Sequence, residues 1–215
     1  LRPHASYAAG NYFLRNFSGK TLYAVKTNPH PCILRALRKS GITRFDVASL
    51  NEIALLNRYI PDSEINFLHP VKNKIAISKA YYDYNVRSFA FDSISDIQKI
   101  SDSTNRSNEL TMLLRLSVSN RYSAHSRTGK FGVGTDVALT LLPQAAKYCQ
   151  RLGICFHVGS QCLEPKAYKL ALRTVERVLQ RTNVSIDIID VGGGFPSMYP
   201  GHNPTPLSAY FAQIN

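Results

Sequence analysis

Short apolar segments recur along the chain, and each is bounded by polar or turn-forming residues. Aliphatic and aromatic side chains dominate these segments, which is typical of buried β-strands. We expect seven strands, at Thr21–Lys26, Arg44–Ser49, Ile65–His69, Ser88–Asp92, Leu110–Val118, Gly153–Val158 and Ser185–Val191.

Longer stretches with helical spacing of apolar residues lie between most of these strands. Gly41 follows the first stretch and is a typical helix stop. Glu52 lies three residues after Ser49, which is the spacing of a capping box. We expect helices at Pro31–Ser40, Ser49–Tyr59, Lys72–Tyr84, Ser93–Ser101, Asp136–Leu152 and Pro165–Gln180.

The alternation of strands and helices predicts an α/β fold with a parallel sheet and helical crossovers. Two architectures compete, the doubly wound open sheet and the (β/α)8 TIM-type barrel. Seven near-regular repeats without an obvious reversal favour the barrel. A full barrel needs roughly 250 residues, and this chain has 215 with no long linker. We therefore expect one barrel domain over residues 1–215, incomplete and truncated before the eighth strand.

The composition is that of a chain that folds around a core, with 44% hydrophobic and 19% charged residues. No apolar run approaches the roughly 18 residues that span a bilayer, and no signal peptide is visible. We therefore expect no membrane partner. The net charge of +12 raises the possibility of nucleic-acid binding. The basic residues are scattered at helical spacings, however, so we interpret them as solvated helix surface and expect no nucleic-acid partner.

The chain has four cysteines, and none forms a CxxC pair or lies near a histidine cluster with metal-binding spacing. This pattern predicts reduced thiols, no metal site and a cytoplasmic protein.

Polar residues at the carboxyl ends of barrel strands are the first candidates for chemistry. Lys26 ends an apolar strand, where burial would lower the pKa of its amine and make it nucleophilic. Read alone, such a lysine more often just reaches solvent. The other candidates at strand ends or within strands are Asp46, His69, Asp92, Arg115 and His157.

Three adjacent glycines, Gly192, Gly193 and Gly194, follow the seventh strand. Their amides could converge on an anion, and barrel phosphate sites are commonly built after strands seven and eight. The alternative is a tight turn. His157 and Ser160 follow the sixth strand as a possible ring contact and phosphate donor, although a core histidine is the plainer interpretation.

A basic loop, residues 121–132, follows the fifth strand and could reach over the barrel mouth. Arg127 and Lys130 are its candidates for an anion contact. The plainer interpretation is an exposed loop.

These motifs occur together and in a specific order. The chain resembles the fold-type III decarboxylases that depend on pyridoxal 5'-phosphate (PLP) and act on ornithine, lysine, diaminopimelate or arginine. FHVGSQ, together with Pro70 and Lys72, is most similar to the ornithine/lysine branch. The resemblance runs from about Ser6 to Tyr199 and rests on YAVKTN, FDVAS, HPVK, FAFDS, RTGKFG, FHVGSQ and DVGGGFP.

The resemblance implies an alanine racemase-like barrel, a PLP cofactor and a role for each matching residue. Lys26 would hold the cofactor, and His157 would stack on its ring. Ser160 and the three glycines would hold its phosphate, while Asp46 and Arg127 would lie near the reacting end. The implied reaction is decarboxylation of an amino-acid substrate to a diamine in polyamine biosynthesis, by a full-length homodimer.

The chain also departs from the family pattern. It contains no EPGR motif, whose glutamate pairs with the pyridine nitrogen, and no C-terminal β-domain with its catalytic cysteine. We therefore expect the 215 residues alone to bind the cofactor weakly, to be inactive and to expose apolar surface. One alternative is a non-catalytic, decarboxylase-like protein that binds a regulatory partner. Another is a cofactor-carrier barrel or a racemase, which shares the fold but does not characteristically combine FHVGSQ with GGGFP.

Overall fold

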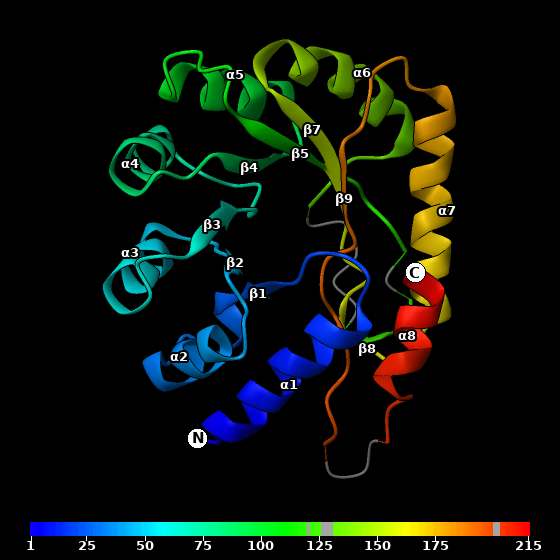
Figure 1. The fold of residues 1–215 in the computed structure, drawn as a ribbon. Helices are drawn as coiled ribbons and strands as arrows, with labels where there is room; N and C mark the ends of the chain where they lie inside the picture. The colour runs from blue at the N-terminus through cyan, green and yellow to red at the C-terminus, as the bar shows by residue number, and fades with distance from the viewer. Residues whose placement is uncertain (120, 126–130, 200–202) are drawn as a thin grey trace. The chain divides into compact units, whose positions relative to one another are not determined.

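The computed structural model describes residues 1–119, 121–125, 131–199 and 203–215 (Figure 1). The chain divides into two compact units. Unit 1 comprises Leu1–Phe89 and Lys99–Ser107, and unit 2 comprises Ala90–Gln98 and Asn108–Asn215. The two units are described one at a time below.

The parallel strands follow one another in chain order, β1-β2-β3-β4-β5-β7-β9. A doubly wound sheet would reverse this order at a switch point, so the barrel-type prediction is confirmed. Each of the seven predicted segments overlaps one observed strand. The strands are β1 (Leu22–Ala24), β2 (Arg44–Asp46), β3 (Glu64–Phe67), β4 (Ser88–Phe91), β5 (Thr111–Arg115), β7 (Arg151–Cys155) and β9 (Ile188–Asp190).

In unit 1, helices α2, α3 and α4 lie on the same side of strands β1 to β3 (Figure 1). Helix α1 was not predicted, because the side chain of Arg2 provides no cap and the apolar stripe is weak. It packs on α2 through Gly10, where an added Cβ would lie 2.1 Å from Ser40 Oγ. The helices are α1 (Pro3–Asn16), α2 (Pro31–Lys39), α3 (Leu50–Tyr59) and α4 (Lys74–Tyr84), and α5 (Ile94–Ser103) spans both units.

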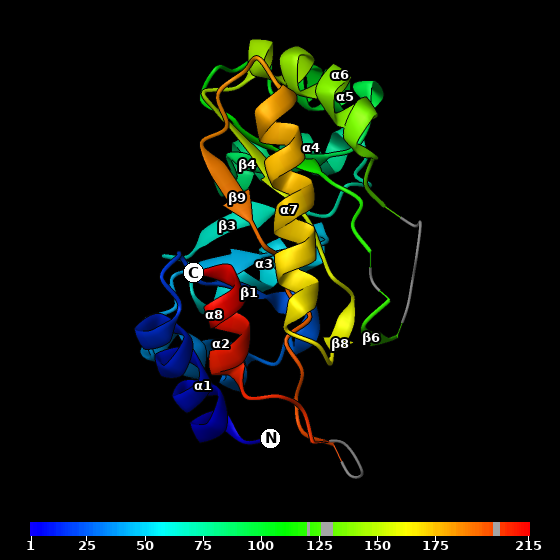
Figure 2. The same ribbon diagram turned by 90° about the vertical axis from the view of Figure 1, so that its right-hand side faces the viewer.

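Unit 2 adds helices α6, α7 and α8, with α8 packed beside α7 (Figure 2). Two further strands, β6 and β8, pair antiparallel. Neither α8 nor this strand pair was predicted. The bounds are β6 (Ser123–His125), α6 (Thr135–Ala145), a 3-10 turn (Ala146–Tyr148), β8 (Ser160–Cys162), α7 (Lys166–Arg181) and α8 (Leu207–Ile214).

The helix predicted at Asp136–Leu152 is too long. Helix α6 ends at Ala145, and Arg151 and Leu152 already belong to β7. Their backbone pairs with β5, so sheet hydrogen bonding overrides the helical pattern there. Leu152 to Cys155 are all buried, as a parallel strand covered on both faces requires.

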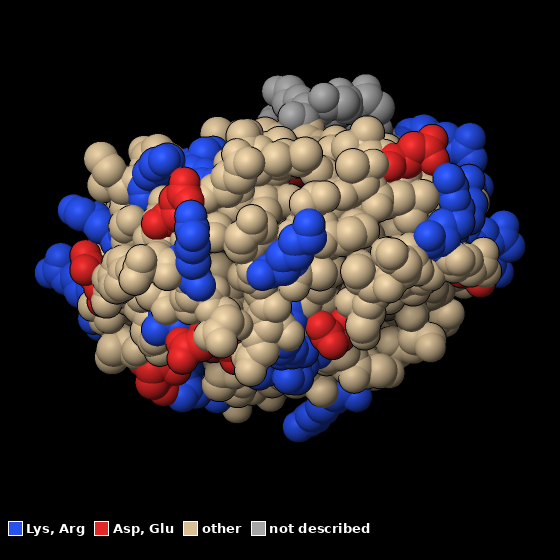
Figure 3. Space-filling model, turned by 90° about the horizontal axis from the view of Figure 1, so that it is seen from above, with Lys and Arg blue, Asp and Glu red and all other residues tan. Residues whose placement is uncertain are grey.

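Lys and Arg side chains are scattered over the face seen in Figure 3, with acidic side chains among them. Basic side chains of the chain also pair locally with carboxylates, such as Arg44 Nε with Glu64 Oε2 at 2.8 Å and Arg181 with Asp136 at 3.1 Å. Among the described residues, every helix is too short or too polar to span a bilayer. The four cysteines, all described, form no disulfide.

Ser49 caps helix α3 as the sequence predicts. Its Oγ accepts a hydrogen bond from the Glu52 amide at 3.3 Å, and Glu52 Oε2 accepts one from the Ala48 amide at 2.6 Å. We predict that Ser49→Ala lowers the free energy of unfolding by about 1 kcal/mol, because an amide of the first turn loses its acceptor. Urea denaturation measures the difference. Ser185→Ala, at an exposed serine outside any helix, is the control and should change it by less than about 0.5 kcal/mol.

Candidate active site

The predicted site residues fall into two groups, one in each unit. Lys26 and Asp46 belong to unit 1, whereas His157, Ser160 and the glycines 192–194 belong to unit 2. Arg127 and Lys130 lie outside the described residues. The geometry of each group is given separately.

In unit 1, Asp46 ends strand β2 and pairs in register with Ala24, the last residue of β1. Lys26 follows two residues later, in a 3-10 turn formed by Val25–Thr27. Asp46 is thus the last residue of its strand and Lys26 lies just beyond the neighbouring parallel strand, so both lie at the carboxyl ends of these strands.

The expectation that Lys26 ends the strand and is buried is wrong. Strand β1 stops at Ala24, and the tight turn that follows buries Val25 completely. The side chain of Lys26 is exposed instead. Its amine is therefore accessible to a ligand that approaches from solvent.

In unit 2, His157 follows strand β7 and is only partly exposed. Its Nδ1 accepts a hydrogen bond from the Gly159 amide at 3.0 Å. A nitrogen that accepts carries no proton, so the neutral ring carries its proton on Nε2. The turn thus fixes the orientation of the imidazole and leaves Nε2 as its donor.

The glycine loop after β9 approaches the loop after β7 backbone to backbone. A Cβ on Gly192 would lie 2.0 Å from Phe156 O, and one on Gly194 would lie 2.2 Å from Gly159 O. Both residues also have positive φ, 67° and 112°. A Cβ on Gly194 would also lie 3.3 Å from His157 Cε1, so the imidazole borders this loop. Glycine is required at both positions for space as well as for conformation.

This loop has the features of an anion site. A Cβ built on Gly193 meets nothing within 4 Å, so the loop is open at its centre. In the part of the chain that the structure describes, the amides of Gly193 and Gly194 have no protein acceptor, and the exposed Ser160 hydroxyl has no partner. Donors without a protein acceptor beside an open loop fit a phosphate group.

Asp190 is the last residue of β9 and lies two residues before Gly192. It was not among the candidate site residues from the sequence. Its Oδ1 accepts a hydrogen bond from the Gly192 amide at 2.8 Å. Burial raises the pKa of Asp190, while the Gly192 amide and the charge of Arg115 act in the opposite direction. An acidic residue in an apolar strand just before a glycine run is the sequence signal that could have identified it.

The strand register explains why Arg115 acts on Asp190. Arg115 pairs with Cys155, and Cys155 pairs with Asp190, so the three residues lie at one level of β5, β7 and β9. Arg115 was a candidate from the sequence, and the structure places it beside the strand that carries the glycine loop.

The other candidates at strand ends have local structural contacts. Asp92 Oδ2 accepts a hydrogen bond from the Gly132 amide at 3.1 Å, within unit 2. The carbonyl of His69 accepts one from Lys72 Nζ at 2.6 Å, within unit 1. In each case the contact holds a loop that follows a strand.

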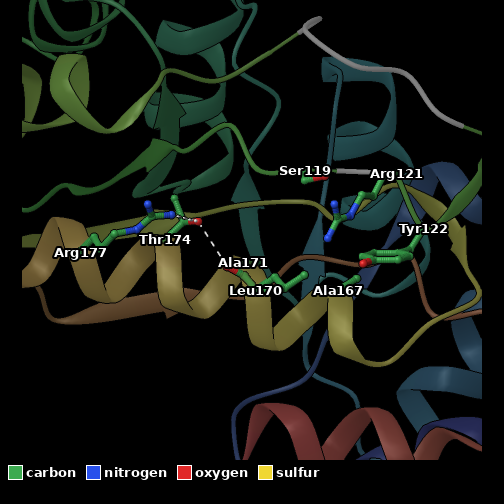
Figure 4. A pocket seen from close by; sticks show the side chains of 8 residues that line it. All are labelled: Ser119, Arg121, Tyr122, Ala167, Leu170, Ala171, Thr174 and Arg177. Atoms are coloured by element: carbon green, nitrogen blue, oxygen red, sulfur yellow. Dashed lines mark hydrogen bonds between the residues drawn. The ribbon is translucent and has the colours of Figure 1, made fainter.

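A separate hollow of about 250 Å³ lies on helix α7 and contains none of the predicted site residues. Figure 4 shows Arg121 and Arg177 toward its two ends, with Leu170 and Ala171 of α7 between them. Arg177 donates to Thr174 Oγ1 at 3.1 Å. Among the described residues, no group of three or more side chains could hold a metal ion.

Comparison with known proteins assigns the chain to a family. Residues 8–215 match the family described as "Pyridoxal-dependent decarboxylase, pyridoxal binding domain". The lysine/ornithine decarboxylase of Selenomonas ruminantium is 37% identical over 179 residues, which cover 81% of this chain and 44% of that protein. Antizyme inhibitor 2 of Homo sapiens is 29% identical over 182 residues, which cover 82% of this chain and 38% of that protein.

The fold is also that of a solved relative. A crystal structure of an SrLDC mutant in complex with PLP superposes with a TM-score of 0.86 at 33% identity. The match covers 98% of this chain and 56% of that one. The chain therefore spans less than half the length of the two curated relatives and somewhat more than half of this structure.

The two glycines Gly193 and Gly194 allow a matched test of the loop geometry. We predict that Gly194→Ala lowers the free energy of unfolding by about 2 to 4 kcal/mol, because the methyl group meets a carbonyl oxygen at positive φ. Gly193→Ala has space and no positive φ, so it should change stability by less than about 1 kcal/mol. Urea denaturation of both variants checks the prediction, and equal losses would contradict it.

Proposed function

The chain belongs to the pyridoxal-dependent decarboxylases, and on this premise we propose that it binds PLP through Lys26 and the glycine loop for decarboxylation of a basic amino acid. The observation that supports this most is the glycine loop itself. Gly192 and Gly194 are sterically obliged to be glycine, and the amides of Gly193 and Gly194 have no protein acceptor within the described chain. Such a loop suits a phosphate monoester.

In this proposal each predicted residue has a physical task. The exposed amine of Lys26 is the covalent anchor, which solvent and a ligand can both reach. Ser160 donates its hydroxyl to the phosphate, beside the amides of Gly193 and Gly194, and Gly192, whose own amide donates to Asp190, lets the loop approach closely. His157 presents its imidazole, whose orientation the Gly159 amide fixes, to a planar ring.

Asp46 and Arg127 complete the proposed set near the reacting end of the cofactor. Asp46 ends β2, the strand that pairs with β1, which precedes Lys26. Its carboxylate would form an ion pair with a protonated amine. PLP, when bound, supplies an electron sink for the pair of electrons that remains when CO2 leaves. The residues of this chain orient the ring and the phosphate. His157 holds its proton on Nε2.

The substrate class we propose is ornithine or lysine, in polyamine biosynthesis. The similarity to a lysine/ornithine decarboxylase supports this class. We further propose that the complete enzyme is a cytoplasmic homodimer, and that the 215 residues supply the cofactor site without the full catalytic set. The short coverage of the relatives supports this division.

A second candidate function is a non-catalytic relative that binds a regulatory partner. The similarity to antizyme inhibitor 2 is the observation that favours it. The two functions differ in cofactor binding at Lys26, because a protein that only binds a partner needs no reactive amine there.

Lys26→Ala tests the cofactor anchor. We predict that the parent chain, mixed with PLP, gains a visible absorbance band and retains the cofactor covalently on Lys26 after borohydride reduction. Lys26→Ala should lose both, because the nucleophilic amine is gone. Mass spectrometry locates the adduct. Lys20→Ala, at another exposed lysine, is the matched control and should keep both signals. A parent chain that shows no band favours the partner-binding alternative.

Turnover by the 215 residues is a separate prediction. We expect no measurable release of labelled CO2 from ornithine or lysine above the level of free PLP. A version of the protein extended over the length of its relatives should show turnover. Decarboxylation by the 215-residue chain, lost on Lys26→Ala, would show that the catalytic set is already complete.

A further inference from the structure

We infer that the Tyr168 hydroxyl is a positioning group for phosphate binding, because it orients the peptide between Gly193 and Gly194. The inference rests on the proposed function and adds a residue of α7 to it. Tyr168 belongs to none of the motifs by which the chain resembles its family, and only the tertiary structure brings it to the glycine loop.

The hydrogen bond concerned joins a helix side chain to the backbone of the loop. Tyr168 Oη donates to the carbonyl oxygen of Gly193 at 3.1 Å. The Cys162 amide donates to the carbonyl oxygen of Gly194 at 2.8 Å. Two successive carbonyls of the loop are therefore held by partners on the same unit.

The orientation of the amides follows from peptide geometry. The peptide bonds are trans, so the N–H of each unit points opposite to its C=O. The carbonyl of Gly193 points to Tyr168, and the amide of Gly194 consequently points away from it. A loop of three glycines has little conformational preference of its own, so these carbonyl partners decide which way its amides face.

The ring of Tyr168 is held independently of its hydroxyl. It stacks on Phe195 at 5.1 Å between ring centroids with an interplanar angle of 14°, and it meets the edge of Tyr210 at 6.0 Å. Tyr168 and Tyr210 are both fully buried. Removal of the hydroxyl alone should therefore leave the ring in place.

The hydroxyl of Tyr168 stays protonated near neutrality, so it remains a donor there. Burial raises the pKa of Tyr168 far above its ordinary value, and nearby acidic groups act in the same direction. The bond to Gly193 therefore does not depend on pH near neutrality.

Tyr210 supplies a matched control in the same aromatic cluster. Its hydroxyl donates to a backbone carbonyl as well, that of Cys162 at 2.7 Å, which lies outside the glycine loop. Tyr168→Phe and Tyr210→Phe each delete one buried hydroxyl that bonds a carbonyl, and only the first releases a carbonyl of the loop.

The experiment compares PLP with pyridoxal, which has the same aldehyde and no phosphate, on the parent chain and both variants. We expect Tyr168→Phe to reduce PLP affinity about three- to tenfold, the size of one lost hydrogen bond, and to leave pyridoxal affinity unchanged. Tyr210→Phe should keep the parent ratio of the two affinities. With inorganic phosphate, the amide resonance of Gly194 should shift in the parent and less in Tyr168→Phe.

Three results would overturn the inference, and they differ in what else they affect. A Tyr168→Phe variant that keeps the parent ratio removes Tyr168 from the site and leaves the proposed function standing. Equal reductions in both variants show that the cluster acts through packing alone. A parent chain that binds PLP no better than pyridoxal overturns the phosphate site, and the inference with it.

Discussion

The backbone contact between two loops of unit 2 is the constraint on which the candidate site depends. Carbonyl oxygens of Phe156 and Gly159 occupy the space where Gly192 and Gly194 would carry a Cβ. Contact this close excludes every other residue at both positions. It also brings the turn that orients His157 next to the glycine loop, so an imidazole and amides without a protein acceptor lie in one place.

A loop made of glycines cannot hold itself, because it loses the most conformational entropy and has no side chains to pack. The stabilisation comes from its surroundings. Phe195, directly after the loop, contacts Tyr168, Tyr210 and Phe211 through its ring. On the other side, the Asp190 carboxylate accepts from the Gly192 amide. Helices α7 and α8 thus supply through packing what the loop lacks.

Unit 1 presents its candidate residue in a different way. Its candidate lysine lies on a tight turn, and the neighbouring Val25 takes the buried position. Within the turn the apolar Val25 anchors the chain, and the amine of Lys26 stays accessible. Covalent attachment of a ligand requires such access.

The sequence by itself determined the seven strands, the barrel-type order and the glycines of the loop, because apolar runs and glycine have direct physical meanings. It also predicted the cap at Ser49, a local hydrogen bond. It could not place Lys26 on an exposed turn, end α6 before Arg151, or identify Asp190, Tyr168 and helix α8. Those features depend on strand pairing, on burial and on contacts between residues far apart in the chain, such as Tyr168 with Gly193, and only the tertiary structure decides such contacts.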